Sequence, residues 1–510
     1  MKQSYTKNYL SIYFFQALSI ILGFVSLFIV VPSLSSNQTV YGVYSICTSV
    51  TILLAYADLG FLSAGTKYAS EYYAKGDKEN ELRVIGFSHF ILLVVVLLLS
   101  AAFIYLSFKP ELLIKDLEPG ESRQIAQKLL LILGVFSPTV VFQRMVQMVF
   151  IIRVENYKVQ RVTIVGNLVK ILSVLFFFRP GHYDLIGYYL AFNIINVIVV
   201  VINFIQAKVG VGYSPRQLFS HLKFSKDIFL KVKDLAFSSL FMTIAWIVFY
   251  ELDSVVIGKT LGAERVAIYA IGLTVLGFIR SILGVFFSPF EARFNHFIGL
   301  GDTVKLKHFY LKIMQVMFPI VVFPLSAIAI MAGPITVSWV GAGYSESIKI
   351  VMLLSLCNLF AFVSYPCGTL LVAQEKIKDL YIVYGLQPLV YWIGVFLLMN
   401  LLNIHGFAIM KLTVFVLMGC FYLWYSLRFI EVKFDSFLKQ VVLPSLPGFT
   451  VMAGMLFLAN GLFCIDKSIK YLFLNAAVIG SAILIGFAIT YFTSPVIKNQ
   501  IKDVIKTLKK

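Results

Sequence analysis

Charge is scarce in this sequence. Of its 510 residues only 13% are Asp, Glu, Lys or Arg, whereas a soluble globular domain carries roughly 25%. The sequence also lacks Walker A, Walker B and HExxH motifs, so we expect neither ATP hydrolysis by this chain nor a zinc site of that type. Cysteine is scarce too. The cysteines stand singly without a CxxC motif, which excludes a disulfide framework and a cysteine metal site; they are Cys47, Cys357, Cys367, Cys420 and Cys464.

The sequence is rich in apolar residues. They make up 59% of the chain, the mean hydropathy is +0.88, and apolar runs of about 20 residues, enough to cross a bilayer, recur from end to end. The N-terminal run is long enough for a full span and lacks a cleavage site, so we interpret it as the first helix and not as a signal peptide. The sequence therefore predicts an all-α, polytopic membrane protein with about fourteen transmembrane helices, at 9–33, 41–65, 82–108, 126–152, 160–178, 183–206, 235–258, 267–292, 308–333, 346–373, 379–402, 404–429, 439–463 and 468–493.

Basic residues outnumber acidic ones by 43 to 25, which gives a net charge of +18. They gather in alternate connections between the predicted spans, beginning with Lys2 and Lys7 and ending with the lysine-rich tail. The positive-inside rule explains this distribution when both termini are cytoplasmic and the number of spans is even. The positive charge therefore indicates a membrane orientation, and we expect no nucleic-acid partner.

A long internal repeat divides the chain. The matching pairs, at an offset of 225 residues and further along of about 219, include Tyr44 and Tyr269, Gly76 and Gly301, Asp77 and Asp302, Gly166 and Gly385, and Gly187 and Gly406. Two six-helix copies enter the membrane from the same side, which predicts a parallel repeat about an axis along the membrane normal. The predicted organisation is an N-terminal six-helix lobe at 1–206, a basic cytoplasmic linker at 207–234, a C-terminal six-helix lobe at 235–430, and two appended helices with a basic tail at 431–510. The linker is basic and amphipathic, which indicates a helix on the inner leaflet.

Of the basic residues inside the predicted spans, we single out four, because a charge deep in the bilayer costs on the order of 2.5–3.5 kcal/mol and needs a reason. Arg280 lies near the midplane of the eighth span, and its repeat partner is Ala55. It either faces a cavity that binds an anionic substrate or forms a structural ion pair. Lys170, Arg144 and Lys411 are further candidates for such a cavity. Each of these three also has the alternative of pairing or of extending toward the membrane interface.

Acidic residues within the spans are fewer. Asp58 lies in the second span, and Glu251 and Asp253 lie in the outer part of the seventh. Burial raises the pKa of a carboxylic acid, so such a group can carry a proton or bind Na⁺ and couple transport to an ion gradient. The alternatives are helix capping and ion pairing, for Glu251 or Asp253 with Arg280. Apart from Na⁺ or H⁺ we expect no cofactor.

Several motifs resemble one family of transporters. The sequence YGVYS at 41–45, ADLGF at 57–61, KYASEYYAKGDKE at 67–79 and LDSVVIGKTLGAERVAIYAIG at 252–272 are similar to Wzx-type polysaccharide and O-antigen flippases. These belong to the wider superfamily of MATE transporters and lipid II flippases. The resemblance covers essentially the whole chain, including a layout of twelve plus two helices. It implies two helical lobes that work by alternating access.

The resemblance also implies a cargo and a location. The cargo is an undecaprenyl-diphosphate-linked oligosaccharide, a repeat unit of O-antigen of lipopolysaccharide, capsule or exopolysaccharide. Arg280, with Lys170 and with Arg144 or Lys411, would bind its diphosphate. The protein would lie in the bacterial cytoplasmic membrane, and its partners would be membrane lipids and proteins of a glycan polymerase or export complex. Lipid II flippases carry arginines in helices 1, 2 and 8, whereas only helix 8 has one here, which argues against lipid II.

Three other functions stay open. A cation-coupled multidrug exporter of the same superfamily would prefer an acidic cavity, whereas this chain has bases near mid-depth. A membrane glycosyltransferase or polymerase needs a large exposed loop with acid and base groups, but the longest outer loop, at 109–125, contains no histidine. We therefore expect no enzyme. A non-transporting scaffold for a glycan-export complex is the third possibility.

Overall fold

The computed structural model describes residues 5–115, 117, 119–374, 377–460, 467–495 and 497–498. Every regular element within these ranges is a helix, and they contain no β-strand. The predicted all-α fold is therefore confirmed. Cys464 and the tail at 499–510 lie outside the described residues.

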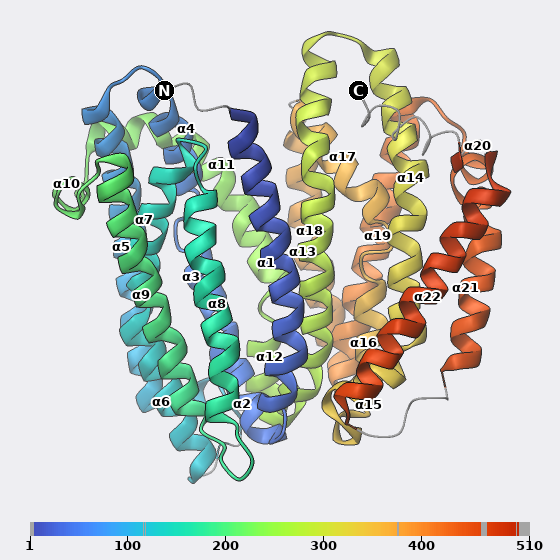
Figure 1. Cartoon of the computed structure of the whole chain (residues 1–510), viewed down its shortest axis with the longest axis horizontal. Helices are drawn as coiled ribbons and strands as arrows, with labels where there is room; N and C mark the ends of the chain where they lie inside the picture. The colour runs from blue at the N-terminus through green and yellow to red at the C-terminus, as the bar shows by residue number, and fades with distance from the viewer. Residues whose placement is uncertain are drawn as a thin grey trace. The chain divides into compact units, whose positions relative to one another are not determined.

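The helices form two compact units, Met1–Ala267 and Ile268–Lys510, which Figure 1 colours from blue to green and from green to red. The first unit contains α1 (Tyr5–Leu34), α2 (Gln38–Ser49), α3 (Thr51–Ala55), α4 (Phe61–Ala74), α5 (Lys78–Phe108), α6 (Glu121–Phe136), α7 (Thr139–Ile151), α8 (Tyr157–Phe177), α9 (Leu185–Val211), α10 (Pro215–Ser220), α11 (Lys226–Tyr250) and α12 (Asp253–Leu261). From α13 (Ala263–Gly299) onward the helices are α14 (Thr303–Ile330), α15 (Ala332–Val340), α16 (Ser347–Leu356), α17 (Ala361–Ala373), α18 (Ile377–Leu402), α19 (Ile404–Ile430), α20 (Phe434–Phe437), α21 (Leu446–Ala459) and α22 (Ile469–Thr493).

The number of membrane spans agrees with the sequence. Within the described ranges eleven helices are long and apolar enough to cross a bilayer, and counting three bent helix pairs as one span each raises the number to fourteen. The bent pairs are Glu121–Phe136 with Thr139–Ile151, Lys226–Phe237 with Leu240–Tyr250, and Ser347–Leu356 with Ala361–Val372. The first pair bends by 41° at Pro138, which has no backbone N–H to continue the helix. All fourteen overlap the predicted spans, although the second ends at Ala55 and not at 65, and the seventh covers Lys226–Tyr250 and not 235–258.

The sequence repeat reappears as a repeated turn. Gly76 and Gly301 adopt left-handed backbone angles, with φ of 73° and 66°, a region that glycine enters without steric cost. The next residue in each case is the N-cap of a long helix: Asp77 Oδ1 accepts a hydrogen bond from the backbone of Asn80 at 3.1 Å, and Asp302 Oδ1 accepts one from the backbone of Lys305 at 2.9 Å. The matching residues therefore start α5 and α14 by the same device.

A second pair of caps occurs at the offset of 219 residues. Asp184 Oδ1 accepts a hydrogen bond from the backbone of Gly187 at 2.8 Å at the start of α9. Asn403 Oδ1 accepts one from the backbone of Ile404 at 2.9 Å at the start of α19. The last helix of each predicted six-helix copy thus begins at equivalent residues. This shared helix start explains why the two copies still resemble each other in sequence at this point.

The segment predicted as a linker differs from its expected form. In place of one amphipathic helix the chain forms the short α10 and then the start of α11, which packs on α4 and α5. Leu218, Ile228 and Val232 are buried in the core of the first unit. The apolar residues that suggested contact with a leaflet instead contact protein. Because α11 and α12 pack within Met1–Ala267, the predicted seventh span lies in the first unit. The lobes 1–206 and 235–430 stay a prediction from the repeat.

The appended helices α21 and α22 pack against each other and on α14 and α15. Their crossing depends on small residues: a Cβ atom added at Gly448 would lie 2.2 Å from the carbonyl oxygen of Gly486 and 2.1 Å from Thr490 Oγ1. Small residues allow such close approach of helices within a membrane. Phe323, Met331 and Met452 form a buried core between these helices and α14.

The N-cap at Asp77 generates a testable expectation. Hydrogen bonds from the Asn80 side chain and backbone lower the pKa of Asp77, so the carboxylate stabilises the fold above its unfolded-state pKa, near 4, and loses this effect as the pH falls through the folded-state value. We expect Asp77→Ala to lower the unfolding midpoint at pH 7 in detergent and Asp77→Asn, which keeps an acceptor, to lower it less. Equal midpoints for wild type and Asp77→Ala would contradict the cap.

Candidate functional site

The seven residues singled out from the sequence divide between the two units. Arg144, Lys170, Asp58, Glu251 and Asp253 belong to the first unit, and Arg280 and Lys411 belong to the second. We describe each group within its own unit.

Arg144 and Asp58 meet at a break in the second span. The helix ends at Ala55, and Leu59 and Gly60 then take left-handed backbone angles, with φ of 51° and 80°, before α4 begins. Arg144, on α7, donates a hydrogen bond from Nη2 to the carbonyl oxygen of Ala55 at 2.7 Å, and its Nη1 lies 3.9 Å from Asp58 Oδ1. The last carbonyls of a helix have no partner within the helix. The guanidinium supplies one, and its positive charge suits the negative helix end.

Lys170 lies among polar and aromatic groups of α8 and α9. Its ammonium donates hydrogen bonds to Asn196 Oδ1 at 2.6 Å and to Asn167 Oδ1 at 3.4 Å. The same ammonium lies 4.2 Å from the ring centroid of Phe192, at cation–π distance. Amide oxygens and the ring face therefore solvate this half-buried charge.

Glu251 and Asp253 flank the junction between α11 and α12. Glu251 is the C-cap residue of α11. Asp253 is the first residue of α12, and its side chain is fully buried. A carboxylate in the first turn of a helix is stabilised by the positive end of the helix dipole. The position of Asp253 at the start of α12 therefore explains an acidic residue there without any role in ion coupling.

Arg280 lies in the middle of α13, which runs without a break from Ala263 to Gly299. The side chain is half-buried and interacts electrostatically with Tyr365 of α17. Tyr365 in turn interacts with Tyr384 of α18, and its ring stacks on Phe287 at a centroid distance of 5.0 Å. Arg280 on α13 thus shares an electrostatic environment with tyrosines of α17 and α18 in the second unit. Guanidinium and phenolic donors suit phosphate and sugar oxygens.

Lys411 is fully buried in the second unit. Its ammonium lies 5.1 Å from the ring centroid of Tyr391, which is itself buried. The side chain therefore does not extend to the membrane interface, which was one of its two predicted alternatives. The reason is packing: α19 presents Lys411 to α18, with which it makes extensive contact.

The sequence analysis missed a buried ionic cluster in the first unit, which we call the Arg153 cluster. Arg153 Nη2 lies 2.8 Å from Glu81 Oε1, and only 6% and 2% of the two side chains are exposed. Tyr213 donates a hydrogen bond to Glu81 Oε2 at 2.8 Å. Burial and this bond raise the pKa of Tyr213, so the hydroxyl keeps its proton. The Arg153 guanidinium also lies against the rings of Tyr73 and Tyr213, at 4.5 and 4.4 Å.

The Arg153 cluster lines a cavity of about 440 Å³, together with Lys78 and Glu155. It joins the start of α5, the turn after α7 and the residues after α9. From the sequence Arg153 counted only as a cytoplasmic positive charge. Glu81 precedes the predicted span at 82–108, and only the structure, in which α5 begins at Lys78, places this acid one turn into the helix.

The sequence matches the profile of one family. The description of that family is "Polysaccharide biosynthesis protein", and the match covers residues 5–290. No curated protein matches the chain.

Solved structures share the fold. The structure titled "Lipid II flippase MurJ, inward closed conformation" has a TM-score of 0.67 and 16% identity, covering 95% of this chain and 99% of its own. An inward-facing multidrug resistance MATE family transporter of the MOP superfamily has a TM-score of 0.63 and 13% identity, covering 81% and 94%. A MOP superfamily transporter from Pyrococcus furiosus has a TM-score of 0.53 and 14% identity, covering 83% and 95%. The protein therefore has the fold of flippases and transporters of this superfamily.

The Arg144 contact at the helix break yields a second prediction. Arg144→Met removes a charge-assisted hydrogen bond to the half-buried Ala55 carbonyl, and we expect a loss of about 1.5–3 kcal/mol. Asp58→Asn removes an ion pair that is long at 3.9 Å, and we expect a loss below about 1 kcal/mol. Reversible unfolding in detergent would measure both. Because Arg144→Met removes both contacts, a loss for Asp58→Asn as large as the loss for Arg144→Met would show that the ion pair, and not the carbonyl contact, holds the break.

The Arg153 cluster yields a third prediction. Removing one partner of a buried ion pair typically costs 3–5 kcal/mol, about the loss we expect for Glu81→Ala. Arg83→Ala is the matched control, because its ion pair with Asp227 is exposed and contributes about 0–1 kcal/mol. A double-mutant cycle with Arg153→Ala should give losses that do not add. Additive losses would mean that Glu81 and Arg153 stabilise the unit independently.

Proposed function

Because this chain belongs to the polysaccharide biosynthesis protein family, we propose that it is a flippase for an undecaprenyl-diphosphate-linked oligosaccharide in the bacterial cytoplasmic membrane. The oligosaccharide is a repeat unit of O-antigen, capsule or exopolysaccharide. The family match over residues 5–290 carries this proposal. The fold shared with a lipid II flippase supports it, because lipid II flippases move a glycolipid. Both termini lie on the cytoplasmic side in this proposal.

Arg280 is the residue that we assign to the diphosphate. The cargo presents two adjacent phosphates, and a guanidinium offers several donors in a fixed geometry that matches phosphate oxygens. The hydroxyl of Tyr365, with which Arg280 interacts electrostatically, supplies a further donor. A charge near mid-depth also favours an anionic cargo over the cationic drugs that a multidrug exporter would carry. Lys170, with its two asparagine partners, is a secondary contact for the glycan or a phosphate.

The remaining candidates have different roles in this proposal. Arg144 is engaged by Ala55 and Asp58, so we assign it to holding the helix break and not to cargo. Asp58, Glu251 and Asp253 are the candidates for coupling to Na⁺ or H⁺. A glycan polymerase or export complex is the protein partner that such a cargo would require after translocation.

The fourth prediction compares lipid-linked glycan translocation in proteoliposomes for wild type and Arg280→Ala. Losing a charge-assisted contact of about 1.5–3 kcal/mol should raise the cargo concentration for half-maximal transport roughly 10- to 100-fold. Arg293→Ala is the matched control, because Arg293 is exposed on the same helix, and it should stay within about twofold.

Each alternative has its own outcome. Equal translocation by wild type and Arg280→Ala would keep the flippase and make Arg280 structural. Export of a cationic dye, with no translocation of any lipid-linked glycan, would favour the multidrug exporter. Turnover of the glycan into a longer chain would indicate a polymerase. Normal assembly of a glycan-export complex without transport would indicate a scaffold.

A further inference from the structure

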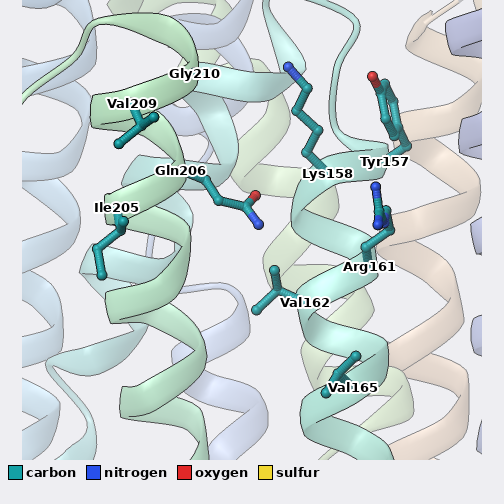
Figure 2. Close-up of a pocket in the computed structure, with 9 residues that line it drawn as sticks. All are labelled: Tyr157, Lys158, Arg161, Val162, Val165, Ile205, Gln206, Val209 and Gly210. Carbon is teal, nitrogen blue, oxygen red and sulfur yellow. The ribbon is translucent and has the colours of Figure 1, made fainter.

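A groove runs between α8 and α9 at the end where α8 begins and α9 ends. It has a volume of about 580 Å³ and is shown in Figure 2. One wall is formed by Val162 and Val165 of α8 and the other by Ile205 and Val209 of α9. Lys158 and Arg161 lie along the α8 wall at the same end. We call this feature the α8–α9 groove.

The apolar walls of the α8–α9 groove are exposed on the surface of the first unit. Val165, Ile205 and Val209 expose 59%, 56% and 81% of their surface. Their neighbours further along the two spans, Leu172 on α8 and Ile198 on α9, are exposed as well. In a membrane span such side chains contact acyl chains and not water. The groove therefore opens toward lipid.

The α8–α9 groove carries net positive charge. Lys158 Nζ lies 2.7 Å from Glu155 Oε2, so one of the two cations is already partly balanced. The Arg161 guanidinium lies 5.9 Å from the ring centroid of Phe15. The ring is neutral, so this contact does not cancel the positive charge of Arg161. Lys208 is exposed on the last turn of α9. Basic pockets between helices at the cytoplasmic side suit anionic lipid headgroups.

Gln206 adds a polar group inside the groove. Figure 2 shows its side chain extending from α9 toward α8. Its Oε1 atom is buried and has no hydrogen-bond partner among the described residues. A side-chain amide offers both donors and an acceptor, and a buried acceptor without a partner is unfavourable. The groove therefore suits a ligand with two features. Its anionic group would accept hydrogen bonds from the cations, and its hydroxyl group would donate a hydrogen bond to the amide oxygen of Gln206.

The length of the apolar strip matches one leaflet. Leu172 follows Arg161 by eleven residues, which is about 16 Å along a helix. Half of a bilayer core is about 15 Å thick. A headgroup at Arg161 would therefore place an acyl chain of ordinary length along Val165 and Leu172.

A related groove occurs in the second unit. It has a volume of about 720 Å³ and is lined by Trp424, Arg428 and Lys433, among others. At the repeat offset of 219 residues Trp424 corresponds to Ile205, and Arg428 corresponds to Val209. The basic side chains stand at different positions in the two grooves, because Arg428 corresponds to the apolar Val209 and the cations of the first groove lie on α8. The likeness is limited to an apolar groove with basic residues at the end of the last helix of each copy.

We propose that the α8–α9 groove binds an anionic glycerophospholipid whose headgroup carries hydroxyls, such as phosphatidylglycerol. Lys158 and Arg161 bind the phosphate, and a headgroup hydroxyl donates to Gln206 Oε1. One acyl chain lies along Val162, Val165 and Leu172. The site holds a resident membrane lipid and is separate from the cargo contacts assigned to Arg280.

The test counts phosphatidylglycerol bound to the full chain in detergent by native mass spectrometry. We expect Lys158→Gln/Arg161→Gln to bind one lipid fewer than wild type, or to need at least about tenfold more lipid for it. Arg179→Gln is the matched control, because Arg179 is an exposed arginine that follows the far end of α8. It should leave the count unchanged. Equal unfolding midpoints in phosphatidylcholine would establish that the variants fold.

A second variant separates the headgroup from the phosphate. Gln206→Leu should weaken phosphatidylglycerol binding about 2- to 13-fold, as for one neutral hydrogen bond. It should leave phosphatidic acid, whose phosphate carries no alcohol, unchanged. Equal binding of both lipids by all variants would overturn the proposal.

Other occupants would also overturn the proposal and are visible in the same measurement. Tighter binding of farnesyl diphosphate than of phosphatidylglycerol, lost in the double variant, would assign the groove to a prenyl diphosphate. A dimer of the chain that is lost in the double variant would assign it to a second copy. The readout is lipid binding and not translocation, so it stands independently of the proposed function.

Discussion

A lipid bilayer offers the backbone no hydrogen-bond partner, and the structure follows from this constraint. Every regular element in the described part of the chain is a helix, because a helix satisfies its own N–H and C=O groups. The informative places are those where a helix is interrupted. At the break after Ala55 the guanidinium of Arg144 replaces the missing donor. Arg144, which the sequence suggests as a substrate ligand, thus also has a contact with the backbone at this break.

The two copies of the repeat differ in backbone structure at one equivalent position, Ala55 in the first copy and Arg280 in the second. In the first copy the second span stops at Ala55, and a guanidinium from α7 reaches its last carbonyl. In the second copy the matching residue is Arg280, which lies inside α13, an unbroken helix of 37 residues. A guanidinium therefore lies at the same level of the second span in each copy, once from a neighbouring helix and once from the span itself. The guanidinium of the second copy interacts electrostatically with Tyr365 of α17, and the proposed cargo contact is assigned there.

The fold was predictable to a large extent, because the apolar runs that form membrane helices are local signals. The approximate positions of the fourteen spans are the example. The contacts of charged residues were not predictable in the same way. Arg153 and Glu81 are 72 residues apart, and no pattern in the sequence joins them. The core position of Ile228 was missed for a related reason, since an amphipathic helix has the same periodicity whether its apolar face contacts lipid or protein.

The partnership between Arg144 and Ala55 has a consequence for the synthesis of the chain. The two residues are 89 positions apart, and a ribosome adds about 5–20 residues per second. The carbonyl at the end of α3 is therefore made roughly 4–18 s before the guanidinium that satisfies it. The third span, α5, is made within that interval. The contact that closes the break can therefore form only after α7 has been made, although the helix it completes is among the first to be synthesised.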